Sequence, residues 1–395
     1  MPSICFYFQV HQPYRIKKFS FFEISPDLYY FDGYKNSSII KKVAEKCYLP
    51  TNNLILNLID KYQGKFKVAY SITGVAFEQF AQFAPEVIES FKALAQTGCV
   101  EFLGETYYHS LAVLYDEEEF INQVLRHRLL IQSEFNQTPQ VFRNTELIYD
   151  DRIGYLIAGL GYTAILAEGV EQVLGGASPN YIYQAPASCV KLLLKNYGYS
   201  DDIAFRFSNH KWKDFPLTPE KFASWLQRYT NEVQTINLFM DYETFGEHQW
   251  AETGIFNFLR ELPEKVLSHP AWQFKTPSET IRDYNAVAEI SFKHTTSWAD
   301  AERDLSAWQG NRMQKKALKA IYSLKNQVYA TQNHWIIETY KKLQTSDHFY
   351  YMSNKFKADG DVHAYFSPFD SPFDAFIYYM NVLKDFKTQV IRENY

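Results

Sequence analysis

Residues 3–13 read SICFYFQVHQP, an apolar and aromatic run that stops at His11, Gln12 and Pro13. An unbroken apolar run of this length is typical of a strand that is buried on both faces. Similar short runs recur over the first 260 residues and are separated by segments in which apolar residues have helical spacing. Strands and helices in alternation predict a parallel sheet covered by helices. The further predicted strands are 66–72, 99–103, 140–144, 163–167, 203–207 and 235–241.

About seven strands in this order favour a closed or nearly closed β/α barrel over an open sheet. The predicted barrel helices include residues 51–62, 85–97 and 117–135, and residues 168–189, rich in Gly, Ser, Pro and Tyr, predict a long loop. Long helical patterns follow at 301–345 and 372–393. We therefore expect two domains, a barrel over residues 1–260 and a mainly α-helical bundle over residues 261–395 that packs on the barrel and completes the cleft.

The composition excludes several classes of function. The 395 residues carry a net charge of −5, which argues against general binding to nucleic acid. No apolar stretch is long enough to predict a membrane span, and the first residues lack the features of a signal peptide. The four cysteines are far apart in the sequence. We expect a reduced, cytoplasmic protein, and the oligomeric state stays open.

Polar side chains follow four of the predicted strands. In a β/α barrel the chemistry gathers at the carboxyl ends of the strands, so these side chains are predicted to share one rim. Any one of them could be an ordinary loop or surface residue, but the joint pattern favours a functional site. The residues are His11 after the first strand, Glu105 and His109 after 99–103, Glu146 after 140–144, and Asp241, Glu243 and His248 at and after the end of 235–241.

Two carboxylates that face each other across a cleft suit the cleavage of a glycosidic bond, and Glu146 and Asp241 are the candidates. One carboxylate attacks the anomeric carbon, and the other, kept protonated by a raised pKa, donates to the leaving oxygen. A spacing of about 5–5.5 Å would indicate retention and about 6.5–9.5 Å inversion, which the sequence leaves open. Dispersed His and Asp residues can also bind zinc, but the sequence contains no H-x-H or H-E-x-x-H motif. We expect no catalytic metal and no cofactor.

These segments resemble glycoside hydrolase family 57, a family that acts on α-glucans, and its α-amylase-like members in particular. The resemblance runs over nearly the whole chain, and the segments around Glu146 and Asp241 are the most specific. One departure is Gln9, because other members have H-x-H-Q-P at this place. The similar segments are HQP (11–13), GETYYHS (104–110), FRNTELIYDD (142–151), MDYETFGEHQ (240–249), SWADAERDLSAWQGN (297–311), TSDHFYYMSNKF (345–356) and FSPFDSPFDAFIYYMNVL (366–383).

The resemblance implies an incomplete (β/α)7 barrel followed by a helical domain, and a retaining mechanism without a catalytic metal. By the same resemblance Glu146 is the nucleophile and Asp241 the general acid/base. His11, His109 and Glu243 would hold the sugar at the cleavage point. Asp304 and Trp308 would come from the helical part and complete the cleft.

The predicted activity is α-amylase-like hydrolysis of α-1,4-glucans or malto-oligosaccharides through a covalent glycosyl-enzyme intermediate. A 4-α-glucanotransferase is the alternative, because it shares the covalent step and differs only in what accepts the glucosyl group. An alternative of another class is a glucan-binding protein that keeps the fold without turnover.

Overall fold

Strand β1 (Ser3–Val10) lies inside a parallel sheet in the computed structural model, which describes residues 1–20, 22–23, 29–230, 232–355 and 367–394. It pairs with β2 (Val68–Ile72) on one side and β8 (Thr235–Asp241) on the other, and β3 (Val100–Phe102) follows β2. Every residue of β1 is buried, which confirms the prediction from its apolar run.

A second parallel sheet consists of β4 (Val141–Arg143), β5 (Ala164–Glu168) and β7 (Lys191–Lys195). Backbone hydrogen bonds join the edges of the two sheets, from the Gly104 amide to the Val141 carbonyl (2.9 Å) and from the Asn196 amide to the Asn237 carbonyl (2.9 Å). These seven strands, β1–β5, β7 and β8, therefore surround one interior in the part of the chain that the structure describes, and the predicted incomplete (β/α)7 barrel is confirmed. Three short strands extend the sheets: β6 (Ile182–Gln184), β9 (Gln273–Phe274) and β10 (Ala288–Glu289).

Several predicted helices are confirmed almost to the residue, because each starts with a proline in the first turn or with a capping side chain. Helix α2 (Leu49–Lys61) has Pro in its first turn, α4 begins at Pro85, and the Asp116 side chain accepts from the Glu119 amide at the start of α5. The barrel helices are α1 (Gly33–Val43), α2, α3 (Gly74–Phe83), α4 (Pro85–Gln96), α5 (Glu117–Phe135), α6 (Asp151–Gly159), α7 (Glu171–Leu174), α8 (Tyr197–Ala204), α9 (Pro219–Gln227), α10 (Ile255–Leu267) and α11 (Pro277–Asp283).

Two local predictions are wrong. Residues 203–207 are not a strand, because the Asn196 side chain caps α8 and the apolar residues of this run lie at its end. The strand is β7 instead, whose apolar LLL core is flanked by two lysines. Residues 168–189, predicted as a long loop, contain the short elements α7 and β6. Short apolar runs do not distinguish a strand from a helix end by periodicity.

The barrel interior is apolar toward the amino ends of the strands. Tyr7, Val141, Leu166, Leu193 and Phe239 form its core with their neighbours, while the outer faces of the strands pack on the helices. Because side chains alternate between the two faces of a strand, the next inward position lies two residues further along each strand. That position determines which chemistry the barrel presents at its carboxyl end.

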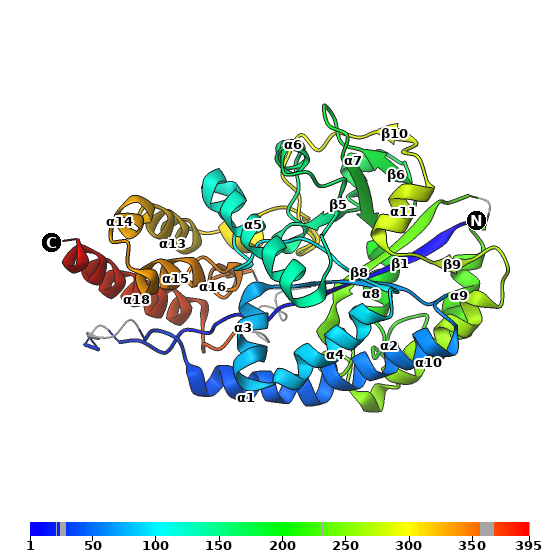
Figure 1. Ribbon diagram of the computed structural model, residues 1–395, viewed down its shortest axis with the longest axis horizontal. Helices are drawn as coiled ribbons and strands as arrows, with labels where there is room; N and C mark the ends of the chain where they lie inside the picture. The colour runs from blue at the N-terminus through cyan, green and yellow to red at the C-terminus, as the bar shows by residue number, and fades with distance from the viewer. Residues whose placement is uncertain (21, 24–28, 231, 356–366, 395) are drawn as a thin grey trace.

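The chain after residue 260 first returns to the barrel, where β9 pairs with β1 and β10 with β6. It then forms a group of helices at one side of the barrel, and the two termini lie at opposite ends of the molecule (Figure 1). The division at residue 260 stays a prediction. No described helix has the length and apolar character that a membrane crossing requires. The helices are α12 (Ser306–Gln309), α13 (Arg312–Tyr322), α14 (Lys325–Ala330), α15 (His334–Lys342), α16 (Ser346–Tyr350) and α18 (Pro372–Glu393).

Candidate active site

The last inward position of five barrel strands is polar. Gln9 and Asp241 are neighbours in the register of β1 and β8, and Glu168 and Lys195 are neighbours in that of β5 and β7. Arg143 occupies the corresponding position of β4. The strands thus lead from an apolar interior to a layer of charged and amide groups at their carboxyl ends.

A cavity of about 240 Å³ opens above this polar layer. Five of the seven residues to which the family resemblance assigns a role line it: His11, His109, Glu146, Asp241 and Glu243. His248, predicted from its place after β8, lines it as well. The rest of the wall includes residues that follow the barrel in sequence. These are Trp298, Ala299, Asp300, Arg303, Asp347, Tyr350 and Tyr351.

Glu146 lies in a single turn, Thr145–Leu147, directly after β4, and its backbone is left-handed (φ 58°). Residues other than glycine adopt this conformation at a cost, and such strain clusters at functional sites. Its carboxylate accepts hydrogen bonds from Trp298 Nε1 (2.7 Å) and Ser346 Oγ (3.0 Å), and His109 Nε2 lies 3.4 Å away. Burial would raise the pKa of Glu146, but the hydrogen bond and charge of His109 and the charge of Arg143 outweigh it and lower the pKa.

Asp241 ends β8 and lines the same cavity as Glu146. Burial and then the negative charge of Glu146 raise the pKa of Asp241 to about 6. The two carboxyls thus have pKa values that are shifted in opposite directions by their surroundings. A pair of this kind combines an ionised carboxylate with a carboxyl that holds a proton in mildly acidic solution.

His109 links Glu146 to a deeper carboxylate. Its Nδ1 lies 3.4 Å from Glu105, whose side chain is fully buried. Burial alone would lower the pKa of His109, but the hydrogen bonds with Glu105 and Glu146 raise it to about 9. Gln9, the departure from the H-x-H-Q-P pattern, donates to Glu105 through Nε2 (3.2 Å). The Gln9 side chain therefore lines the cavity and also contacts a carboxylate below it.

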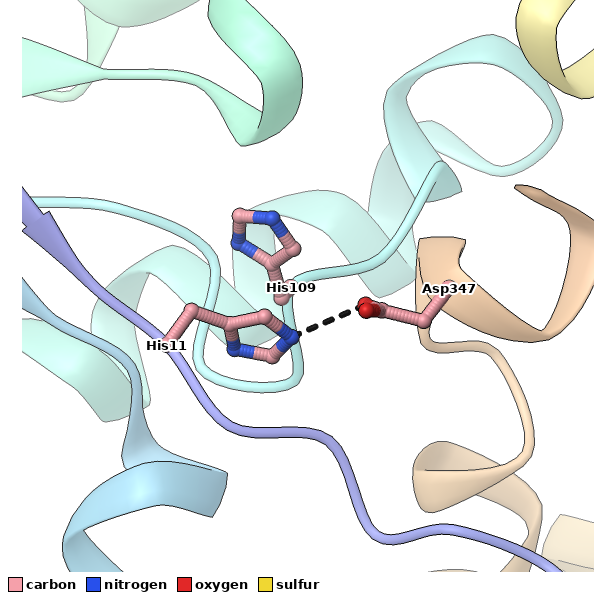
Figure 2. A group of neighbouring side chains, drawn as sticks. All are labelled: His11, His109 and Asp347. Carbon is pink, nitrogen blue, oxygen red and sulfur yellow. Dashed lines mark hydrogen bonds and ion pairs between the residues drawn. The ribbon is translucent and has the colours of Figure 1, made fainter. Parts of the chain in front are cut away.

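His11 stands beside His109, with ring centroids 3.9 Å apart and planes 21° apart (Figure 2). Its Nε2 bonds to Asp347 Oδ2 (2.9 Å) and its Nδ1 to Thr73 Oγ1 (2.9 Å). His11, His109 and Asp347 offer ligand atoms within 4.8 Å of one another. A metal must lie near the plane of each imidazole that binds it, however, and two stacked, nearly parallel rings share no such point. This arrangement suits a hydrogen-bonded clamp better than a metal centre.

Glu243 lies in the turn Tyr242–Thr244 after β8 and accepts hydrogen bonds from the Tyr48 hydroxyl and from Gln12 Nε2 (3.3 Å). Burial and then the charge of Asp241 raise the pKa of Glu243 to about 8. It therefore offers the cavity a protonated carboxyl at neutral pH.

Two predicted site residues do not reach the cavity. Trp308 is only 1% exposed and packs in the core between the barrel and the C-terminal helices. Asp304 is exposed, and its carboxylate accepts from the Ser306 amide (2.8 Å) at the start of α12. The residues of this segment that line the cavity are Trp298, Ala299, Asp300 and Arg303. The segment 297–311 thus reaches the cavity through other side chains than Asp304 and Trp308.

Sequence reasoning also missed Ser346 and Asp347. Both belong to α16 and contact residues at the ends of barrel strands. The only signal that could have found them was that residues 345–356 resemble the same family as the barrel segments. Spacing alone could not reveal contacts that join positions hundreds of residues apart.

The chain is similar to known proteins in sequence and in fold. A sequence model of glycosyl hydrolase family 57 matches residues 5–293. A Methanocaldococcus jannaschii protein named "Putative alpha-amylase" is 47% identical over 400 residues, which cover 97% of this chain and 84% of that protein.

Two solved structures show the same fold. One is a GH57-type branching enzyme from Pyrococcus horikoshii (TM-score 0.67, 14% identity, 97% of this chain and 88% of that chain). The other is a 4-α-glucanotransferase from Thermococcus litoralis (TM-score 0.65, 14% identity, 88% of this chain and 56% of that chain).

Proposed function

Because this chain belongs to glycosyl hydrolase family 57, we propose that it is a retaining, α-amylase-like hydrolase of α-1,4-glucans. The single observation that carries the proposal is that Glu146 and Asp241 share one cavity while their pKa values are shifted in opposite directions. Glycosidic cleavage with retention needs such a pair.

In the first proposed step, Glu146 attacks the anomeric carbon and Asp241 gives its proton to the glycosidic oxygen. The bond to Glu146 forms as the glycosidic bond breaks, and the shortened glucan leaves as an alcohol. In the second step, the ionised Asp241 takes a proton from water, which attacks the same carbon and releases Glu146. Ser346 and Trp298 position Glu146, because each donates to one of its oxygens.

An α-glucan is the substrate class, and a malto-oligosaccharide is the finer proposal. His11, His109 and Glu243 would hold the sugar at the cleavage point, because each lines the cavity beside the two carboxyls. Trp298 would complete the cleft, the role that the family resemblance implies for Trp308, since its half-buried side chain lines the cavity.

A 4-α-glucanotransferase is the second candidate, and the aromatic residues of the cavity wall support it. Tyr350, Tyr351 and Trp298 line the cavity. Aromatic rings there could hold an acceptor sugar in place of water.

We also propose a cytoplasmic location, because the four cysteines are all unpaired.

Incubation of the purified protein with maltoheptaose, with products resolved by chain length, tests the proposal. Shorter sugars alone indicate hydrolysis, and shorter and longer sugars together indicate transfer. Proton NMR of the first product formed gives the anomer, and an α product supports retention. Binding of maltoheptaose without any product would instead support a silent glucan-binding protein.

A further inference from the structure

Arg143 is a fully buried cation beneath the reaction centre. It ends β4, three residues before Glu146, and its side chain occupies the polar layer of the barrel without lining the cavity. Two residues earlier on the same strand, Val141 belongs to the apolar interior. The guanidinium therefore lies between an apolar floor and the carboxyls above it.

The guanidinium has no hydrogen-bond partner among the described residues, for Nε, Nη1 or Nη2. Its clearest contact is with the ring of Trp298, whose centroid is 4.7 Å from Cζ. Lys195 Nζ lies 5.4 Å from the same centroid. A buried charge without a partner is costly, and groups in such perturbed surroundings cluster at functional sites.

The absence of an ion pair between Arg143 and Glu146 is itself informative. A direct bidentate pair would occupy the oxygens of Glu146 that must attack carbon. Here each of those oxygens accepts one hydrogen bond, from Trp298 or from Ser346, and keeps a lone pair for the attack, while the cation acts from a distance through a low dielectric. Trp298 joins the two, since its ring lies on Arg143 and its N–H donates to Glu146.

Resting on the function proposed above, we propose that Arg143 is a positioning residue: its fixed charge favours the ionised form of Glu146, and its guanidinium orients the indole that holds this carboxylate. The charge also acts on Asp241, where it limits the rise in pKa that burial and Glu146 cause. The titratable groups that interact with its charge are Tyr7, Glu105, His109, Glu146 and Asp241, and Lys195 shares the ring of Trp298 with it.

The first test is the pH profile of kcat/KM on maltoheptaose for wild type, R143M and R143K. Methionine keeps the volume without the charge, and R143Q is the substitute if R143M does not fold. Loss of the cation is expected to shift the acid limb and the alkaline limb of the profile to higher pH, by about one pH unit. R143K keeps the charge and should restore the limbs, although it cannot reproduce the planar stack on Trp298.

A matched control is R128M. Arg128 also lies over an aromatic ring, 4.5 Å from the centroid of Tyr162, but it belongs to helix α5 and not to the polar layer at the ends of the barrel strands. Its removal costs a comparable contact and is expected to leave both limbs unchanged.

The second test does not need turnover. Carboxyl ¹³C resonances of Glu146 and Asp241, assigned by their loss in E146Q and D241N, are titrated in wild type and R143M. Both carboxyls are expected to titrate at higher pH in R143M. A folded R143M with unchanged carboxyl titrations overturns the inference, whether or not the wild type hydrolyses glucan. Shifted titrations in a protein without turnover would support the role of Arg143 and overturn only the proposed function.

Discussion

Trp298 Nε1 donates a 2.7 Å hydrogen bond to Glu146, across 152 residues of sequence. The backbone amide of Trp298 also donates to the Glu146 carbonyl (3.1 Å). The carboxylate at the end of β4 is therefore held by a segment that the chain forms only after the barrel. Residues of the barrel and residues that follow it in sequence therefore form the site together.

Substitution W298F should separate the hydrogen bond from the ring. Phenylalanine keeps the aromatic face toward Arg143 but lacks the N–H, and a hydrogen bond to a charged group contributes about 1.5–3 kcal/mol. We expect kcat/KM on maltoheptaose to fall roughly ten- to a hundredfold. W335F is the control, because Trp335 is 76% exposed. Equal activity in W298F and wild type would remove this bond from the mechanism.

Substitution of Glu146 and substitution of Asp241 should remove different parts of the reaction, the attack on carbon and the protonation of the leaving group. We expect E146Q and D241N each to lower turnover of maltoheptaose by several orders of magnitude, while the melting temperature stays close to that of the wild type. With α-maltosyl fluoride, whose leaving group needs little protonation, D241N should still form the glycosyl-enzyme intermediate, which mass spectrometry of the intact protein detects. E146Q should not, because it lacks the nucleophile. Labelling of E146Q at wild-type rates would reassign the nucleophile.

The pH dependence of kcat/KM follows from the two shifted carboxyls. Asp241 must hold its proton to protonate the leaving group, so activity is present below its pKa of about 6 and is lost as the pH rises through that value. Glu146 must be ionised, and its lowered pKa places the acid limb below the range of an ordinary glutamate. The expected profile is a bell with a mildly acidic optimum. In D241N the alkaline limb near pH 6 should disappear, and a limb that persists there would belong to another group.

Much of this arrangement is predictable from sequence, because it depends on local patterns. The apolar run of β1 and the capping of α5 are short-range signals, and Glu146 and Asp241 were found because each follows or ends a strand. The strand at 203–207 was wrong because α8 ends on apolar residues, and β7 was missed between its lysines. Ser346 and Trp298 could not be found by spacing, since they meet Glu146 through the packing of the C-terminal segments on the barrel.

Chelation should leave the activity unchanged. His11 and His109 are stacked, and His109 is engaged with Glu105 and Glu146, so the cluster with Asp347 is already satisfied by hydrogen bonds. We expect kcat/KM to be the same before and after dialysis against EDTA, and added zinc not to raise it. D347N should instead lower kcat/KM by roughly tenfold or more, since the hydrogen bond from His11 to a charged carboxylate becomes a weaker one to a neutral amide. Activity lost on chelation and regained with zinc would identify a metal site here.

Trp308 and Asp304 are expected to affect stability rather than sugar binding. Trp308 is buried among the C-terminal helices, so W308A should cost about 3–5 kcal/mol of unfolding free energy. W308F should cost less, because it keeps most of the ring volume. D304A removes an acceptor for the first amide of α12 and should cost about 1 kcal/mol. Urea titrations measure these losses, and isothermal calorimetry with maltoheptaose measures binding under conditions where each variant is folded. A core residue that does not line the cavity should change the free energy of unfolding and leave sugar binding unchanged. A W308F variant with wild-type stability but at least tenfold weaker binding of maltoheptaose would therefore place Trp308 in the sugar site.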